Sequence, residues 1–128
     1  MAGDWQPVSG ILHQPEISNF WGGLEAGANV CGFLRLTMAP YAQGGTAFEM
    51  TFDGAPLASQ YVRWYPYQVH RLAETASGLR VQSGTRMAFE ANQVLITFNV
   101  TNPTAAPIST TVSLALNPRI RKYTTGWN

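Results

Sequence analysis

The fold of this chain is decided by residues 94–116, which read VLITFNVTNPTAAPISTTVSLAL. Apolar residues share one face of each arm: Val94, Ile96, Phe98 and Val100, then Ile108, Val112, Leu114 and Leu116. Such alternation is typical of β-strands with one buried face. Because Asn102-Pro103 and Pro107 stop both strands, we expect an antiparallel hairpin with a loop of about five or six residues.

Similar alternation precedes this hairpin. Strands are predicted at residues 68–74, 79–82 and 85–90, with turns at Ser77-Gly78, Ser83-Gly84 and Ala91-Asn92. Together with residues 94–116, these segments predict a meander of about five strands.

The first half of the chain adds further strands. Phe48, Met50 and Phe52 alternate with polar residues up to an Asp53-Gly54 turn, and residues 30–38 form another apolar segment. The glycine-rich residues 19–28, NFWGGLEAGA, predict a bulged strand or a loop.

The whole pattern predicts an all-β fold in a single domain, residues 1–128, which could be part of a larger protein. About eight to ten short antiparallel strands favour a β-sandwich, because a lipocalin-type closed barrel has longer and more even strands.

Composition excludes several function classes. Charged residues make up 12% and the net charge is +1, so we expect no nucleic-acid partner and no attraction to an acidic membrane. No apolar run is long enough to span a bilayer. The first residues, MAGDWQPVSGILHQPE, lack the basic segment of a signal peptide, which favours a cytoplasmic protein unless a leader was removed.

Residues that carry chemistry are few. Cys31 is the single cysteine and is expected to be a buried free thiol, and with two histidines it makes no zinc signature. We therefore expect neither a metal nor a cofactor. Glu16 and Glu25 lie in irregular segments without a nameable partner. Glu49, Glu74 and Glu90 fall on outward positions of predicted strands, and Asp53 starts a turn. The chain is not expected to be an enzyme.

The densest aromatic cluster is YVRWYPYQVH, residues 61–70. Large aromatic residues dominate protein cores, but their faces also stack on sugar rings. We keep both hypotheses, core or interdomain packing and ligand contact. The candidate ligand-binding residues are Arg63, Trp64, Tyr65 and Tyr67.

Two segments carry a resemblance over about residues 60–120: WYPYQVHRLAETASGLRVQSGTRM and QVLITFNVTNPTAAPISTTVSLALNP. They resemble the N-terminal β-sandwich (supersandwich-like) domain of bacterial glycoside hydrolases with an (α/α)6 catalytic barrel, of the trehalase, glucosidase and debranching types. The matching features are the strand at 94–102, the proline loop at 103–107 and the returning strand at 112–116. The resemblance implies no catalytic residue here, because the family's carboxylates lie on the helical barrel.

These observations lead to one expected function and two alternatives. We expect a non-catalytic accessory domain of a carbohydrate-active enzyme, with a helical-barrel catalytic domain or a carbohydrate as partner. The first alternative is an independent carbohydrate-binding module, and the second is a small enzyme or ligand-binding β-barrel. Exposed strand edges would also allow a homo-oligomer.

Overall fold

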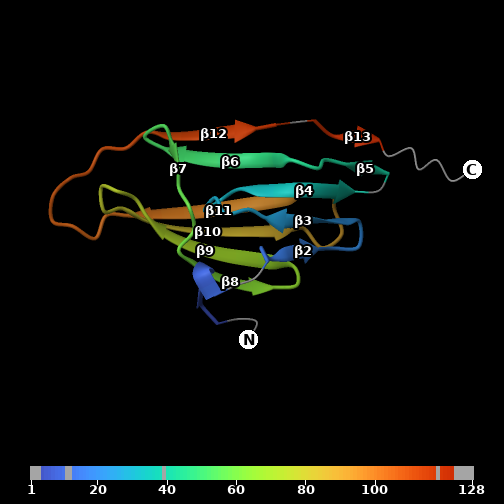
Figure 1. Ribbon diagram of the computed structural model, residues 1–128, viewed down its shortest axis with the longest axis horizontal. Helices are drawn as coiled ribbons and strands as arrows, with labels where there is room; N and C mark the ends of the chain where they lie inside the picture. Colours follow the sequence, from blue (N-terminus) through green and yellow to red (C-terminus); the bar gives the residue numbers. More distant parts are fainter. Residues whose placement is uncertain (1–3, 11–12, 39, 118, 123–128) are drawn as a thin grey trace, which may run out of the picture.

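The computed structural model describes residues 4–10, 13–38, 40–117 and 119–122. These residues form two antiparallel β-sheets packed face to face (Figure 1), so the predicted all-β sandwich is confirmed. Sheet A has the strand order β1-β8-β9-β10-β11, and sheet B has the order β12-β6-β4-β3-β2.

The strands are short, as expected. Sheet A contains β1 (Gln6–Pro7), β8 (Tyr61–Tyr65), β9 (Gln68–Glu74), β10 (Arg80–Met87) and β11 (Val94–Thr101). Sheet B contains β2 (Glu16–Ser18), β3 (Gly22–Ala26), β4 (Phe33–Met38), β6 (Thr46–Phe52) and β12 (Val112–Leu116). Two-residue strands extend sheet B: β5 (Tyr41–Ala42), β7 (Ala55–Pro56) and β13 (Arg121–Lys122). The 3-10 helix η1 (Val8–Gly10) follows β1.

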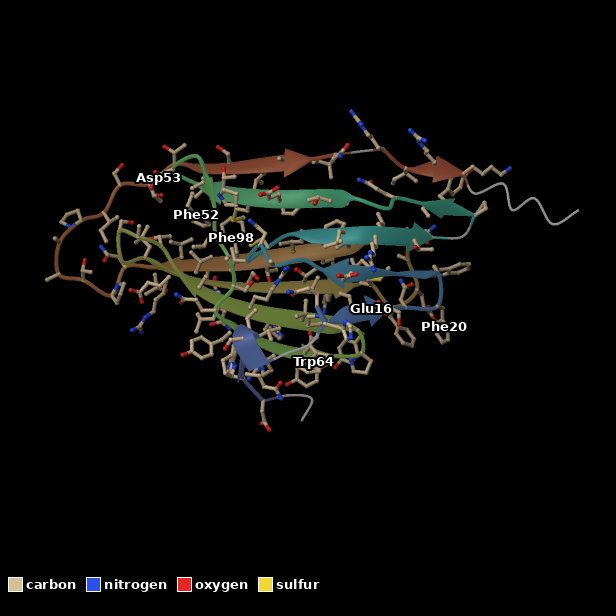
Figure 2. All side chains as sticks on the ribbon, viewed as in Figure 1. Glu16, Phe20, Phe52, Asp53, Trp64 and Phe98 are labelled. Carbon is tan, nitrogen blue, oxygen red and sulfur yellow. The ribbon has the colours of Figure 1, made fainter. Side chains whose placement is uncertain are left out.

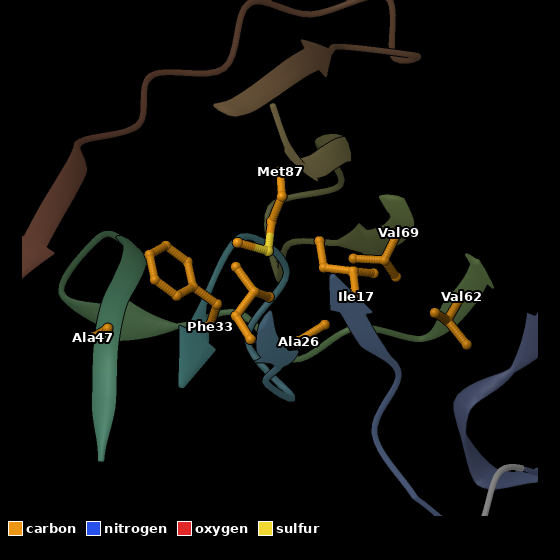
Figure 3. Packing of buried hydrophobic residues seen from close by; sticks show 8 residues of the cluster. Ile17, Ala26, Phe33, Ala47, Val62, Val69 and Met87 are labelled. Carbon is orange, nitrogen blue, oxygen red and sulfur yellow. The ribbon is translucent and has the colours of Figure 1, made fainter. Parts of the chain in front are cut away.

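The hydrophobic core lies between the sheets and uses the inward residues of each strand. Figure 3 shows Ile17 of β2 and Phe33 of β4 packed with Val62, Val69 and Met87 from sheet A. Burial of one such side chain stabilises the fold by about 1.5–3 kcal/mol. A second cluster contains Met50 and Phe52 of β6 with Val30, Cys31, Ala73 and Val81.

The two arms of residues 94–116 are both strands, but they do not pair with each other. β11 pairs with β10 in sheet A, and β12 pairs with β6 in sheet B. The predicted hairpin is therefore wrong, and residues 102–111 carry the chain from one sheet to the other. Asp53 holds the end of this crossover with both its side chain and its backbone. Thr111 N–H donates to the Asp53 carboxylate oxygen Oδ1, and Asp53 N–H donates to the Thr111 carbonyl, both at 2.8 Å.

The predicted turn at Ser83-Gly84 is also wrong, because β10 runs through it without a break. Ser83 is buried and donates its hydroxyl hydrogen bond to the Val30 carbonyl. Gly84 lies opposite His70, and a Cβ there would come within 3.3 Å of His70 Nδ1. Both small residues therefore serve close packing rather than a change of direction.

Other local predictions are confirmed. Gly78 and Gly54 have φ values of +93° and +80°, as expected for residues in turns. The strand that ends at Phe52 is β6. β3 pairs with β4 through a register shift between Gly23 and Glu25, which is the expected bulge.

The two sheets are offset. In Figure 1, β6 and β12 of sheet B lie beyond β11, the last strand of sheet A, while β8 extends past sheet B on the opposite side. The β8 side is covered by the N-terminal segment, because β1 pairs with β8 and Val8 packs against the core. The β11 side has no such cover within the part of the chain that the structure describes.

Candidate functional site

The aromatic stretch divides between two faces of sheet A. Successive residues of a strand point to opposite sides. Val62 is buried in the core and Trp64 packs against the same cluster, so Arg63 and Tyr65 face away from it. Figure 2 shows Trp64 at the β8 side of the sandwich. Of the four candidate residues, Trp64 is therefore separated from the others.

Three rings gather on the outer face of sheet A, and we call Tyr65, Tyr67 and His70 the outer aromatic group. The Tyr65 and Tyr67 rings are stacked, with centroids 6.3 Å apart and an interplanar angle of 24°. The His70 ring meets Tyr65 edge-on, with centroids 6.4 Å apart. Tyr67 is exposed, which leaves ring surface available to a ligand.

Arg63 borders this group on strand β8. Its guanidinium carbon lies 5.1 Å from the centroid of the Trp5 ring, a cation–π contact. It also lies opposite His70 in the β8–β9 register. Burial, with a smaller effect from the Arg63 charge, lowers the pKa of His70 below its ordinary value of 6.5. The imidazole is therefore neutral at pH 7 and can both donate and accept hydrogen bonds.

A shallow hollow of about 330 Å³ lies beside the outer aromatic group. Its polar lining includes Gln68, His70, Arg86 and Thr97, and Gly84 forms part of its surface. Amide, imidazole, guanidinium and hydroxyl groups next to stacked rings suit a neutral ligand that carries many hydroxyl groups.

The second candidate surface is the open edge, formed by Phe98 and Val100 of β11 with Val112, Leu114 and Leu116 of β12. Leu114 lies opposite the fully buried Met50, so it shares the inward direction of the Met50 side chain. It is nevertheless 60% exposed, and Leu116 is 70% exposed. Phe98, labelled in Figure 2, is 41% exposed. The inward-facing side chains of β11 and β12 are therefore exposed, because no described segment covers them.

The open edge is also free of charge. Residues 91–118, which include β11, the crossover and β12, contain no Asp, Glu, Lys or Arg. Protected edge strands usually carry charged side chains, prolines or bulges that prevent pairing with another chain. β11 pairs regularly with β10 over its whole length, without a bulge. This edge is therefore suited to contact with another protein.

A buried arginine joins the two sheets. Arg71 of β9 is 1% exposed, and its Nη1 lies within hydrogen-bonding distance of the carbonyls of Gly27, Asn29 and Gly32, at 2.9, 2.7 and 2.6 Å. Burial lowers the pKa of Arg71 to about 10, so the group remains a cation at neutral pH. Within the described ranges Arg71 takes part in no ion pair, and carbonyl oxygens solvate its charge. This arrangement is structural and holds the 27–32 loop.

Cys31 lies in that loop and is buried, as the sequence predicts. Burial raises the pKa of the thiol, although the nearby Arg71 charge and Ser83 oppose this effect. A buried thiol with a raised pKa is a poor nucleophile.

Glu16 and Glu25 do not lie in irregular segments, as predicted, but on the paired strands β2 and β3. They lie opposite each other in the β2–β3 register, and Arg35 Nη1 lies 3.1 Å from Glu25 Oε2. Arg35 has a φ of +50°, in the left-handed region that few non-glycine residues adopt. The pair is a surface cluster whose charge Arg35 partly balances. No group of three or more potential metal-ligating side chains occurs among the residues described.

Aromatic residues far apart in sequence also meet at one end of the sandwich. Phe20, in the turn between β2 and β3, contacts Phe89 edge-on with ring centroids 5.1 Å apart. Asn19 Nδ2 donates to the carbonyls of Ala88 and Ala91 at 2.6 and 3.0 Å and fixes the contact. Sequence reasoning missed this pair because Phe20 lies in the β2–β3 turn of sheet B and Phe89 in the β10–β11 turn of sheet A, and no local pattern connects the two turns.

Comparisons with known proteins add no identification. No protein family model, curated protein or solved structure matches this chain. The resemblance to glycoside hydrolase sandwich domains therefore stays a prediction. In the described part of the chain, no helix is long and apolar enough to cross a membrane.

Proposed function

We propose that this chain is a non-catalytic accessory β-sandwich domain that packs against a partner protein through the open edge. The observation that carries the proposal is the inward direction of Leu114 and Leu116 combined with their exposure of 60% and 70%. Side chains that point into a core but stay exposed are typical of a surface that another protein covers.

The energetics favour such docking. Covering apolar surface contributes about 25 cal/mol per Å², so a few large side chains of the open edge supply several kcal/mol. Because residues 91–118 are uncharged, a partner covers this surface without desolvating an ionised side chain of that segment.

The resemblance of residues 60–120 to sandwich domains of (α/α)6-barrel glycoside hydrolases supports a carbohydrate-active enzyme as the parent protein. In that setting, the partner surface belongs to the catalytic barrel. The domain then acts as a structural support that packs against the barrel, and the outer aromatic group is available for substrate.

The reading frame that encodes this chain provides the first test, and a helical catalytic barrel in the same polypeptide is the expected result. The separately expressed barrel should bind the chain in calorimetry, and Leu114→Asp should weaken binding at least about tenfold. Ser113→Asp, on the opposite face of β12, is the matched control and should leave binding unchanged. A frame without a catalytic domain, or equal binding by both variants, contradicts the proposal.

The stacked Tyr65 and Tyr67 rings favour carbohydrate binding as a second candidate function. The probes are maltohexaose and cellohexaose, with binding followed by calorimetry. Tyr67→Ala should abolish binding, whereas Tyr41→Ala, which removes an exposed tyrosine of β5 in sheet B, should preserve it. Equal affinity of these two variants for either sugar would exclude the outer aromatic group as the binding site.

A further inference from the structure

We propose that the open edge receives one extended, uncharged β-strand of the partner, which pairs with β11 and packs its apolar side chains against β12. This inference rests on the proposed docking function and specifies the partner's contacting element as an extended segment outside the helices of its barrel. It adds a sixth strand to sheet A at the place where sheet B already extends beyond it.

The backbone of β11 provides the pairing surface. β11 extends over 8 residues and is paired with β10 in a continuous antiparallel register. Within the described ranges, no strand pairs with its other edge. Alternate N–H and C=O groups along that edge therefore point toward the space beside sheet A, as a strand partner requires.

The offset of the sheets provides the space. Neighbouring strands lie about 4.8 Å apart, and stacked sheets lie about 10 Å apart. A strand added to β11 would therefore lie opposite β6 and β12, which extend beyond β11 in Figure 1. The exposure of Leu114 and Leu116 shows that no described segment covers β12 there. Its inward side chains would fill the space between Phe98 of β11 and Leu114 of β12.

A strand fits this space better than a helix. A helix has a diameter of about 10 Å and satisfies its own backbone groups, so it would cover the outer edge of β11 without bonding it. Covered backbone groups that remain unpaired cost free energy. An extended segment both pairs with these groups and presents apolar side chains at every second position.

The lack of charged residues at the open edge also restricts which side chains the inserted strand can carry. The inward side chains of a strand at this position would be enclosed by the apolar residues of β11 and β12. A charged side chain there would lose its hydration without gaining an ion-pair partner, because residues 91–118 carry no charge. The inserted strand therefore has uncharged residues, with apolar ones at alternate positions.

The test uses the full chain and a blocked peptide of alternating threonine and valine, with the length of β11, 8 residues. The control is the same peptide N-methylated at alternate amides, which keeps its side chains but removes backbone donors. We expect the unmodified peptide to bind and to slow hydrogen exchange of the β11 amides. The methylated peptide should bind at least about tenfold more weakly.

Two variants locate the binding. Leu114→Lys places a charge in the proposed space and should abolish peptide binding. Ser113→Lys, on the other face of the same strand, should not. Because Leu114 is 60% exposed, both variants are expected to fold, and circular dichroism checks this directly.

The outcomes separate this inference from the docking function. If neither peptide binds, or both bind equally without protecting β11, strand pairing is wrong, while a tenfold effect of Leu114→Asp on barrel binding still supports docking. If Leu114→Asp also leaves barrel binding unchanged, both proposals fail. A homodimer whose formation protects β11 and excludes the peptide would overturn the inference in favour of a second copy of this chain.

Discussion

Arg71 of β9 and Thr85 of β10 meet between the two sheets, where Arg71 Nη2 donates a hydrogen bond to Thr85 Oγ1 at 2.8 Å. Both residues are buried, and the other terminal nitrogen of Arg71 contacts the carbonyls of the 27–32 loop on the sheet B side. Because it contacts both sides, Arg71 forms a buried polar connection between the two sheets.

Arg71→Met should therefore be strongly destabilising. Methionine fills much of the volume but removes the guanidinium donors. The Gly27 carbonyl then loses its hydrogen bond, while the Asn29 and Gly32 carbonyls keep one backbone donor each, and a buried unsatisfied group costs about 1–3 kcal/mol. We expect the free energy of unfolding in urea to fall by about 3 kcal/mol or more. Arg80→Met, at an exposed position of β10, is the control and should change it by less than about 0.5 kcal/mol. Similar stability of the two variants would contradict this role for Arg71.

Trp64→Ala and Tyr67→Ala should separate packing from ligand contact within one aromatic stretch. Trp64 packs against the core cluster, so its removal should lower the free energy of unfolding by about 2–3 kcal/mol. Tyr67 is exposed, and its removal should cost less than about 1 kcal/mol. Thermal and urea denaturation measure both effects. A larger loss for Tyr67→Ala than for Trp64→Ala would reverse this assignment.

Because of His70, the free energy of unfolding should fall as the pH decreases below about 6.5. Its pKa in the folded state lies below 6.5, so the unfolded chain takes up the proton more readily. The contribution of His70 is therefore complete above about pH 6.5 and is lost as the pH falls below that value. We expect the midpoint of urea unfolding to decrease from pH 7 toward pH 5.

His70→Gln provides the control for this effect. This substitution should remove the part of the pH dependence of stability that is due to His70, while the part due to carboxylates remains. Identical pH profiles of the two proteins would show that His70 has the same pKa in the folded and unfolded states.

Gly22→Ala should disrupt the pairing of β3 with β4. A Cβ at Gly22 would overlap the backbone carbonyl of Thr37, which cannot rotate away as a side chain can. Relief of that overlap requires the two strands to separate, so we expect a loss of about 3 kcal/mol or more in urea denaturation. Gly44→Ala is the matched control, since a Cβ there has no heavy atom within 4 Å. Equal free energies of unfolding for the two variants would show that β3 moves away from Thr37 without loss of stability.

The sequence grouped Arg63, Trp64, Tyr65 and Tyr67 as one candidate ligand surface, and it gave no sign that residues 61–65 form a strand. Because β8 is a strand, Trp64 packs against the core cluster with Val62, whereas Arg63 and Tyr65 face outward. The stacking of Tyr65 on Tyr67 depends on the turn between β8 and β9, which spacing does not describe. The pairing of Glu16 with Glu25 depends on strand register.

The sequence by itself determined that this is an all-β protein, where most strands lie and which of their residues are apolar. A strand has a side-chain period of two, and that period is visible along the chain. Only the tertiary structure decided that β11 pairs with β10 and β12 with β6, in different sheets. Backbone ladders are chemically alike for every strand, so the choice depends on long-range packing, such as the contacts of Arg71 and Asp53 across the fold. The same packing leaves one edge of the sandwich open, although its strands have the alternation of any buried pair.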